Sequence, residues 1–201
     1  MFSVKKNLIA VAFAFSSVFM AFSGEFRDEI FFDFGIGAGG ARYGDSYTRD
    51  MISEVPGSHQ IVLNTNAVFL YPLEKRIFVT GGFDTVFDIC WGGGESVFLW
   101  DYSFTVGFRF YPNLAGICFD VDYALGRRTD FYDLEIEEDG VVKSVDGSES
   151  TRWGNGFVIG LAYDFSYHTD SIAPEISFNW KHMPRGGSSD NYLNLNIRLK
   201  I

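Results

Sequence analysis

The sequence predicts an all-β fold, an eight-stranded antiparallel up-and-down barrel that crosses a membrane. Large apolar residues alternate with small or polar ones along eight segments, which is the two-residue period of a strand with two chemically different faces. The segments are long enough for a tilted strand to cross the hydrocarbon layer, which takes roughly 9 to 11 residues. Short and longer connections also tend to alternate along the chain, as they do in membrane barrels.

The alternation is clearest in residues 97–111, where every second side chain is large and apolar. Seven further segments repeat it: 31–41, 61–71, 77–91, 116–126, 151–165, 172–182 and 191–201. Between these segments we expect tight turns at 72–76, 112–115 and 166–171, a short glycine-rich link at 92–96, and longer connections at 42–60, 127–150 and 184–190. Because such barrels have short turns in the periplasm and longer loops outside, both termini are expected in the periplasm.

A targeting segment precedes the predicted barrel. Two lysines near the start are followed by an almost wholly apolar run, and Ala21 and Ser23 supply the small residues of a cleavage site. We therefore expect a cleaved signal peptide at residues 1–23 and one barrel domain at residues 24–201.

The overall charge narrows the range of functions. The formal net charge is −10, which argues against a nucleic-acid-binding protein, because such proteins are basic. No long apolar run follows the first two dozen residues, so a bundle of transmembrane helices is excluded.

The direction in which the apolar face points follows from the volume of the barrel. The interior of an eight-stranded barrel is just wide enough for side chains to fill it. The bulky rings of segment 97–111 and its neighbours would overfill that space, whereas the opposite face carries many glycines and a few charges. The apolar face is therefore expected to contact outer-membrane lipid. The alternative is a soluble, secreted, lipocalin-like barrel with its apolar face inside.

Charged residues on the inward face are expected to pair, because unpaired buried charges are costly. The predicted lumen network comprises Asp33, Asp84, Asp88, Asp101, Arg109, Asp120, Asp122, Asp164, Glu175, Lys181, Arg198 and Lys200. The first and last strands must meet to close the barrel, and we expect Asp33 to pair with Arg198 or Lys200 across that seam.

Four tryptophans fall toward the same end of their strands. They predict an aromatic girdle at the outer membrane interface, formed by Trp91, Trp100, Trp153 and Trp180.

These features resemble the small eight-stranded outer-membrane proteins of the OmpA, OmpX and OmpW type. The resemblance rests on the signal segment, the motif F-D-F-G-I-G-A-G-G at residues 32–40, the eight alternating segments and the apolar residues at alternate positions of the last strand. It implies insertion into a bacterial outer membrane by the assembly machinery of that membrane. The last residue of such proteins is usually aromatic, whereas here it is Ile201.

Three sets of residues resemble functional sites, but their context in the sequence argues against each of them. The glycines at 35–40 fit a dinucleotide-binding pattern, but no helical pattern follows them, so no cofactor is expected. Cys90 and Cys118 fall at opposite ends of the predicted barrel, too far apart for a disulfide. The histidines show no diagnostic spacing with a nucleophile or base, and no calcium-loop spacing is present, so we expect neither an enzyme nor a metal site. They are His59, His168 and His182.

The most distinctive connection is acidic and contains a predicted hairpin with its turn at residues 139–140. Its acidic residues are Asp130, Asp133, Glu135, Glu137, Glu138, Asp139, Asp146 and Glu149. The segment could be a solvated loop, could attract a cationic partner or divalent ions, or could offer a strand edge to a partner.

Two classes of function remain. The favoured class is a barrel plugged by charges that binds an extracellular or host ligand through its outer loops or has a structural role, as the resemblance to OmpX implies. The alternative is a narrow conduit for small apolar or cationic molecules, as the resemblance to OmpW implies.

Overall fold

The computed structural model describes the backbone of residues 30–112, 116–138, 141–165 and 174–200. The elements are β1 (Phe31–Arg42), α2 (Ser46–Glu54), β2 (His59–Glu74), β3 (Ile77–Gly92), β4 (Glu95–Phe110), β5 (Ile117–Glu138), β6 (Val141–Ser150), β7 (Gly154–Asp164), β8 (Pro174–Arg185) and β9 (Ser188–Lys200). The expected signal peptide lies outside the described residues. Within the described residues, no helix has the length and apolar character needed to cross a membrane.

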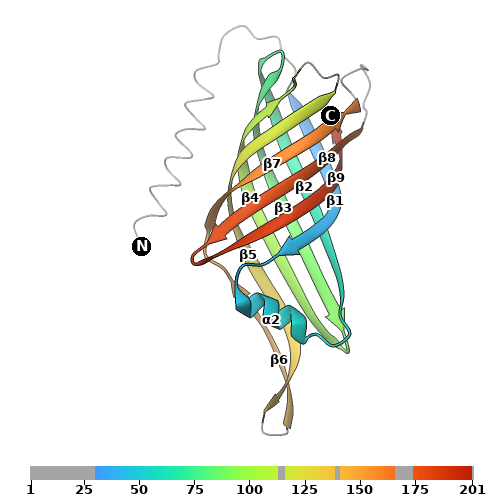
Figure 1. The fold of residues 1–201 in the computed structure, drawn as a ribbon, viewed down its shortest axis with the longest axis vertical. Helices are drawn as coiled ribbons and strands as arrows, with labels where there is room; N and C mark the ends of the chain where they lie inside the picture. The colour runs from blue at the N-terminus through green and yellow to red at the C-terminus, as the bar shows by residue number, and fades with distance from the viewer. Residues whose placement is uncertain (1–29, 113–115, 139–140, 166–173, 201) are drawn as a thin grey trace.

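Eight of the strands close into the predicted antiparallel barrel (Figure 1). The neighbours run in the order β4-β3-β2-β1-β9-β8-β7-β5, and pairing between β4 and β5 completes the ring. β6 stands outside the ring, and within the described residues it pairs only with the far part of β5, where Glu138 lies opposite Val141. The predicted eight-stranded barrel and the hairpin around residues 139–140 are thus confirmed.

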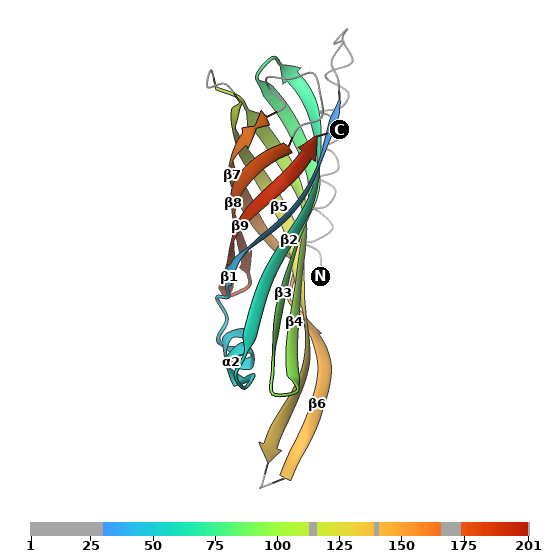
Figure 2. The ribbon, with the colours of Figure 1, turned by 90° about the vertical axis from the view of Figure 1, so that its right-hand side faces the viewer.

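The two ends of the barrel differ in what they carry (Figures 1 and 2). α2 and the β5–β6 hairpin project from one end, which we call the helix end. The start of β1 and the end of β9 lie at the other, which we call the terminal end. β2, β3 and β4 have 16 residues each and β5 has 22, against 12 in β1, so one side of the barrel wall extends further at the helix end.

The prediction of an unstructured connection at 42–60 was wrong, because α2 forms there. Asp45 begins the helix as its N-cap, and its side chain accepts a hydrogen bond of 2.8 Å from the amide of Thr48. α2 buries Thr48 and Met51 against the extended strands, while most of its other residues face away from the protein. Because α2 has so few apolar residues, its sequence shows no helical periodicity. Packing on the strands stabilises the helix instead.

The connection expected at 184–190 is also absent. β8 and β9 stay paired up to Arg185 and Ser188, and only Gly186 and Gly187 link them. Gly186 has a φ of +69°, in the left-handed region that favours glycine. The residues around this turn are polar yet inward-facing, so they resemble a loop when only hydrophobic periodicity is considered.

The apolar face of the strands points outward. Phe34 and Leu195, for example, are 53% and 58% exposed, whereas Arg109 on the inward face is fully buried. The same alternation holds on β4, β5, β7 and β8. The outward direction predicted for the apolar face is confirmed, and the alternative of a lipocalin-like barrel with an apolar interior is wrong.

Closure between β1 and β9 depends on glycines that face inward. A Cβ atom added at Gly39 would lie 1.9 Å from the backbone oxygen of Leu193, whereas at the outward-facing Gly40 it would meet nothing within 4 Å. The two residues are adjacent in the sequence and pair with the same strand. They therefore form a matched pair for testing the seam.

We expect Gly39→Ala to destabilise the barrel by about 1 to 3 kcal/mol, because a side chain there overpacks the seam. Gly40→Ala should be close to neutral. Urea unfolding of the protein refolded into lipid vesicles measures both, and equal effects of the two substitutions would contradict the tight seam.

Candidate functional site

The lumen near the terminal end is filled by a network centred on Arg109. Its guanidinium lies 2.6 Å from carboxylate oxygens of Asp33 and Asp120, and 2.9 Å from Glu175. Arg198 contacts the same Asp120 and Glu175 at 3.0 and 2.9 Å. All five side chains are buried. Each charge thus faces opposite charges, which offsets the cost of removing it from water.

The pairing predicted across the seam is wrong. Asp33 and Lys200 are opposite each other in the backbone register of β1 and β9. The side chain of Asp33 nevertheless contacts Arg109, while Lys200 contacts Asp164, and Arg198 contacts the two acids described above. The side chains of a narrow barrel converge on its axis, so a cation from an opposite strand can be as close as one from a neighbouring strand.

Further polar contacts follow the lumen toward the helix end. Lys181 lies 2.8 Å from Asp84 and 2.6 Å from Asp101, which also contacts Arg185. The other predicted lumen acids also have partners: the hydroxyl of Tyr43 and the amide of Gln60 donate to Asp88, Thr80 donates to Asp122, and Tyr111 and Lys200 donate to Asp164. All twelve residues predicted for the lumen network are thus placed inside the barrel with polar contacts.

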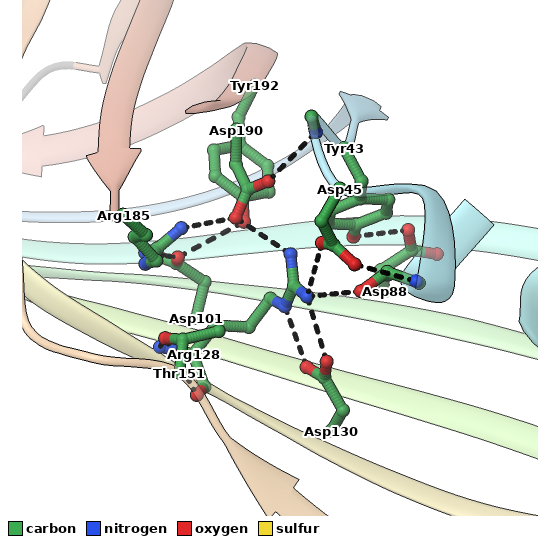
Figure 3. A network of polar contacts seen from close by, with 12 residues as sticks. Tyr43, Asp45, Asp88, Asp101, Arg128, Asp130, Thr151, Arg185, Asp190 and Tyr192 are labelled. Carbon is green, nitrogen blue, oxygen red and sulfur yellow. Dashed lines mark hydrogen bonds and ion pairs between the residues drawn. The ribbon is translucent and has the colours of Figure 1, made fainter. Parts of the chain in front are cut away.

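Arg128 organises a second cluster at the mouth of the barrel (Figure 3). Its guanidinium donates two hydrogen bonds to Asp130, at 2.7 and 2.8 Å, and one of 2.7 Å to Asp190. It also donates to the hydroxyl of Thr48 and, at 3.3 Å, to Asp45. Arg128 therefore joins β5, β9 and the first turn of α2.

The cluster around Arg128 could not be predicted from the sequence. Arg128, Arg185 and Asp190 all fall in segments that composition assigned to loops, and they contact partners as many as 84 residues away. Extending the two-residue period of the strands through these polar segments would have placed Arg128, Arg185 and Asp190 on the inward face.

The charge of Asp45 depends on this cluster. Burial tends to raise its pKa, but the hydrogen bonds from Thr48 and the charge of Arg128 outweigh that effect, so the pKa lies below its ordinary value. A carboxyl with a lowered folded-state pKa stabilises the fold above its unfolded pKa and loses this contribution as the pH falls through the folded value. The link between Asp45 and Arg128 is therefore fully formed at neutral pH.

An apolar core seals the mouth beside the cluster. α2 contributes Met51, β9 contributes Tyr192, and the segments flanking α2 contribute Tyr43 and Val55. The rest come from the inward faces of the extended strands: Val62, Val86, Cys90, Val97, Leu99 and Leu134. Cys118 belongs to a different cluster, with Tyr111 and Ala162, and both cysteines are free.

The four tryptophans lie on the outer surface in the half of the barrel nearest the helix end, each between 37% and 43% exposed. Neighbouring rings contact them: the ring centroids of Phe157 and Trp180 are 5.2 Å apart, and those of His59 and Trp91 are 5.8 Å apart. His182 also lies beside Trp180 on this surface, and His168 is outside the described residues. His59 and His182 thus belong to the belt of rings around the barrel.

The acidic segment does not form one uniform surface. Asp130 is buried and bonded to Arg128, so its assignment to an exposed acidic loop was wrong. The side chains of Asp133, Glu135, Asp146 and Glu149 are exposed on the hairpin. The side chains of Glu137, Glu138 and Asp139 lie outside the described part.

A cleft of about 630 Å³ lies at the foot of the hairpin. It is bounded by α2, by the bases of β5 and β6, and by the turn between β8 and β9. The lining residues are Asp45, Tyr47, Thr48, Arg128, Asp130, Glu149, Ser150, Thr151, Arg152, Arg185, Gly186, Gly187, Ser188 and Asp190.

No protein-family model and no curated protein matches the chain. Solved structures do match it. The attachment invasion locus protein Ail of Yersinia pestis, in complex with the heparin analogue sucrose octasulfate, has a TM-score of 0.57 at 14% identity, covering 87% of this chain and 100% of Ail. Neisserial surface protein A has a TM-score of 0.51 at 12% identity, with the same coverage of both chains.

The chain has the fold of the small outer-membrane barrels. This bears out the resemblance to eight-stranded proteins of the OmpA and OmpX type at the level of fold. In this barrel, charged side chains occupy the lumen, while exposed acids and a cleft lie at the helix end.

Proposed function

We propose that the protein is an integral outer-membrane barrel with a closed lumen that binds an extracellular ligand through its helix end. The outward apolar face and the belt of tryptophans support a position in the membrane. The fold shared with Ail and Neisserial surface protein A supports the same position. Residues 1–23 then act as a signal peptide, residues 24–201 form the barrel, and the assembly machinery of the outer membrane inserts it.

The two ends of the barrel support one orientation in the membrane. The two longest described connections, α2 and the projecting hairpin, both lie at the helix end, although two other links there, at residues 93–94 and 186–187, are as short as the link of Lys75 and Arg76 at the terminal end. Because the longer loops of such barrels face outward, we place the termini in the periplasm and the hairpin at the cell surface.

The observation that carries the binding function is the hairpin itself. β5 runs without interruption from the lumen into a two-stranded projection whose side chains include exposed acids. Ail was solved with a heparin analogue, which is a polyanion. The hairpin of this chain is acidic, so it favours a positively charged ligand.

Thiol labelling of intact cells tests the exposure of the hairpin. Ser148→Cys places a thiol on β6, and Lys75→Cys places one at the terminal end; both native cysteines are buried. A membrane-impermeant maleimide should label the β6 variant in intact cells and label the Lys75 variant only after the outer membrane is permeabilised. The reverse pattern would contradict the orientation and, with it, the surface-binding function.

The conduit is less well supported, because ion pairs fill the lumen from Lys200 to Arg185. We expect the refolded protein to give no steady conductance in a planar lipid bilayer. Reproducible single-channel steps would favour a conduit for small molecules.

A further inference from the structure

We infer that the cleft at the foot of the hairpin binds a short, neutral saccharide. This inference rests on the proposed function, since it requires the helix end to face the outside of the cell. It adds a second ligand to the positively charged one that the hairpin favours. Three features of the cleft carry it: charges that nearly cancel, polar side chains without partners, and one exposed aromatic ring.

The cleft has the size of a site for a small molecule. Its volume of about 630 Å³ lies within the range of roughly 300 to 1,000 Å³ that is usual for such sites. Its walls come from α2, from the bases of β5 and β6, and from the turn between β8 and β9. Gly186 and Gly187 form that turn, and a Cβ atom added at either would meet nothing within 4 Å. The rim of the cleft is therefore open on the side of this turn.

The charges of the cleft nearly cancel, unlike those of the hairpin. Four carboxylates and three guanidinium groups line it: Asp45, Asp130, Glu149, Asp190, Arg128, Arg152 and Arg185. Arg128 contacts all of these carboxylates except Glu149, and Arg185 also contacts Asp190 (Figure 3). The carboxylates would repel a sulfated saccharide, whereas a cation would meet the guanidinium groups. A ligand without net charge is therefore favoured.

Two charged side chains of the lining have no ion pair within the described part of the chain. Glu149 ends β6, Arg152 follows shortly after it, and both are exposed. A carboxylate only accepts hydrogen bonds and a guanidinium only donates them, whereas a hydroxyl group does both. Neighbouring hydroxyls of a sugar ring can thus donate to Glu149 and accept from Arg152. Hydrogen bonds to charged groups are stronger than those between neutral groups.

Tyr47 gives the cleft an apolar surface. It lies in the first turn of α2, lines the cleft and is 56% exposed. Its hydroxyl is hydrogen-bonded to the side chain of Tyr132, and the charge of Glu149 is close enough to act on it. A tyrosine ring offers an apolar face beside a polar tip. A sugar ring could therefore pack its C–H groups on Tyr47 while its hydroxyls reach Glu149.

An array of immobilised oligosaccharides tests the inference directly. Its members are neutral disaccharides and trisaccharides of glucose, galactose and their N-acetylated amino sugars, together with sialylated and sulfated members. The protein is fluorescently labelled and refolded into nanodiscs of zwitterionic lipid. We expect it to bind neutral members. Binding to charged members alone, or to none, would overturn the inference.

Variants locate the site on the protein, with the neutral trisaccharide that binds best as the probe. Tyr47→Ala should weaken its binding at least roughly tenfold, a loss of about 1.4 kcal/mol. Tyr47→Phe keeps the ring and loses only the hydrogen bond to Tyr132, so it should stay within about threefold of the unchanged protein. Glu149→Gln and Arg152→Met should each weaken binding at least roughly fivefold, because each removes a charged hydrogen-bonding group.

A matched control lies on the same helix. Asp50→Asn removes an exposed charge from α2 outside the lining of the cleft and should have little effect. Heat-dependent gel mobility confirms that each variant is folded. Equal binding by Tyr47→Ala and Tyr47→Phe would overturn the inference, and so would a loss with Asp50→Asn as large as that with Glu149→Gln. Thiol labelling reports the orientation independently, so a failure of saccharide binding is distinguishable from a failure of the proposed function.

Discussion

Arg109→Met should destabilise the barrel by about 3 to 5 kcal/mol, the usual cost of removing one partner from a buried ion pair. Arg109 is the only cation paired with Asp33 in the described part of the chain. Arg198 would still contact Asp120 and Glu175, but Asp33 would be left as an isolated buried charge. Urea unfolding in lipid vesicles, followed by tryptophan fluorescence, measures the loss.

Two further variants make this result interpretable. Arg152→Met replaces an exposed arginine in the same way and should change stability by no more than about 0.5 kcal/mol. Adding Asp33→Asn to Arg109→Met should recover part of the loss, because it removes the unpaired charge. If Arg109→Met were as stable as the unchanged protein, the central role of this arginine in the lumen would be refuted.

Arg128→Met should release α2 from the mouth without opening the barrel. Arg128 holds the first turn of the helix through Thr48 and Asp45, and it links the helix to β9 through Asp190. Without it, local opening of α2 becomes more frequent. Trypsin should then cut after Arg49, within α2, at least roughly ten times faster, since proteolysis follows the population of the open form.

The same experiment separates a local effect from a global one. Strands of the barrel should stay protected from trypsin, and the heat-dependent gel mobility of the barrel should be retained. Arg128→Lys keeps the charge but cannot reach all the partners of a guanidinium, so it should give an intermediate rate. An unchanged rate of cleavage after Arg49 would show that Arg128 does not hold the helix.

The strands could be predicted from the sequence because each has two chemically distinct faces. Phe34 and Gly35, or Phe108 and Arg109, differ so strongly that the two-residue period is visible without knowledge of the partners. The outward direction of the apolar face could then be predicted, because the interior of a narrow barrel is too small for so many large side chains. The same alternation predicts which charged residues face the lumen.

The individual contacts could not be predicted in the same way. Arg109 contacts residues on three other strands, as far as 76 positions away, and several acids are equally compatible with it in the sequence. Where β8 and β9 reach the helix end, their inward-facing residues are polar, as at Arg185 and Asp190, so the hydrophobic alternation disappears while these strands continue. α2 was missed because its stabilisation comes from Met51 and Thr48 packing on distant strands.

The length of β5 has a mechanical consequence. It forms fifteen backbone pairs with β4 and ten with β7, and the same strand continues into the hairpin without a hinge. A force applied at the tip of the hairpin would pull β5 along its own axis. The hydrogen bonds to both neighbours would then be loaded together in shear and would not break one after another. A tether held at this point could bear tension without extracting the strand from the barrel.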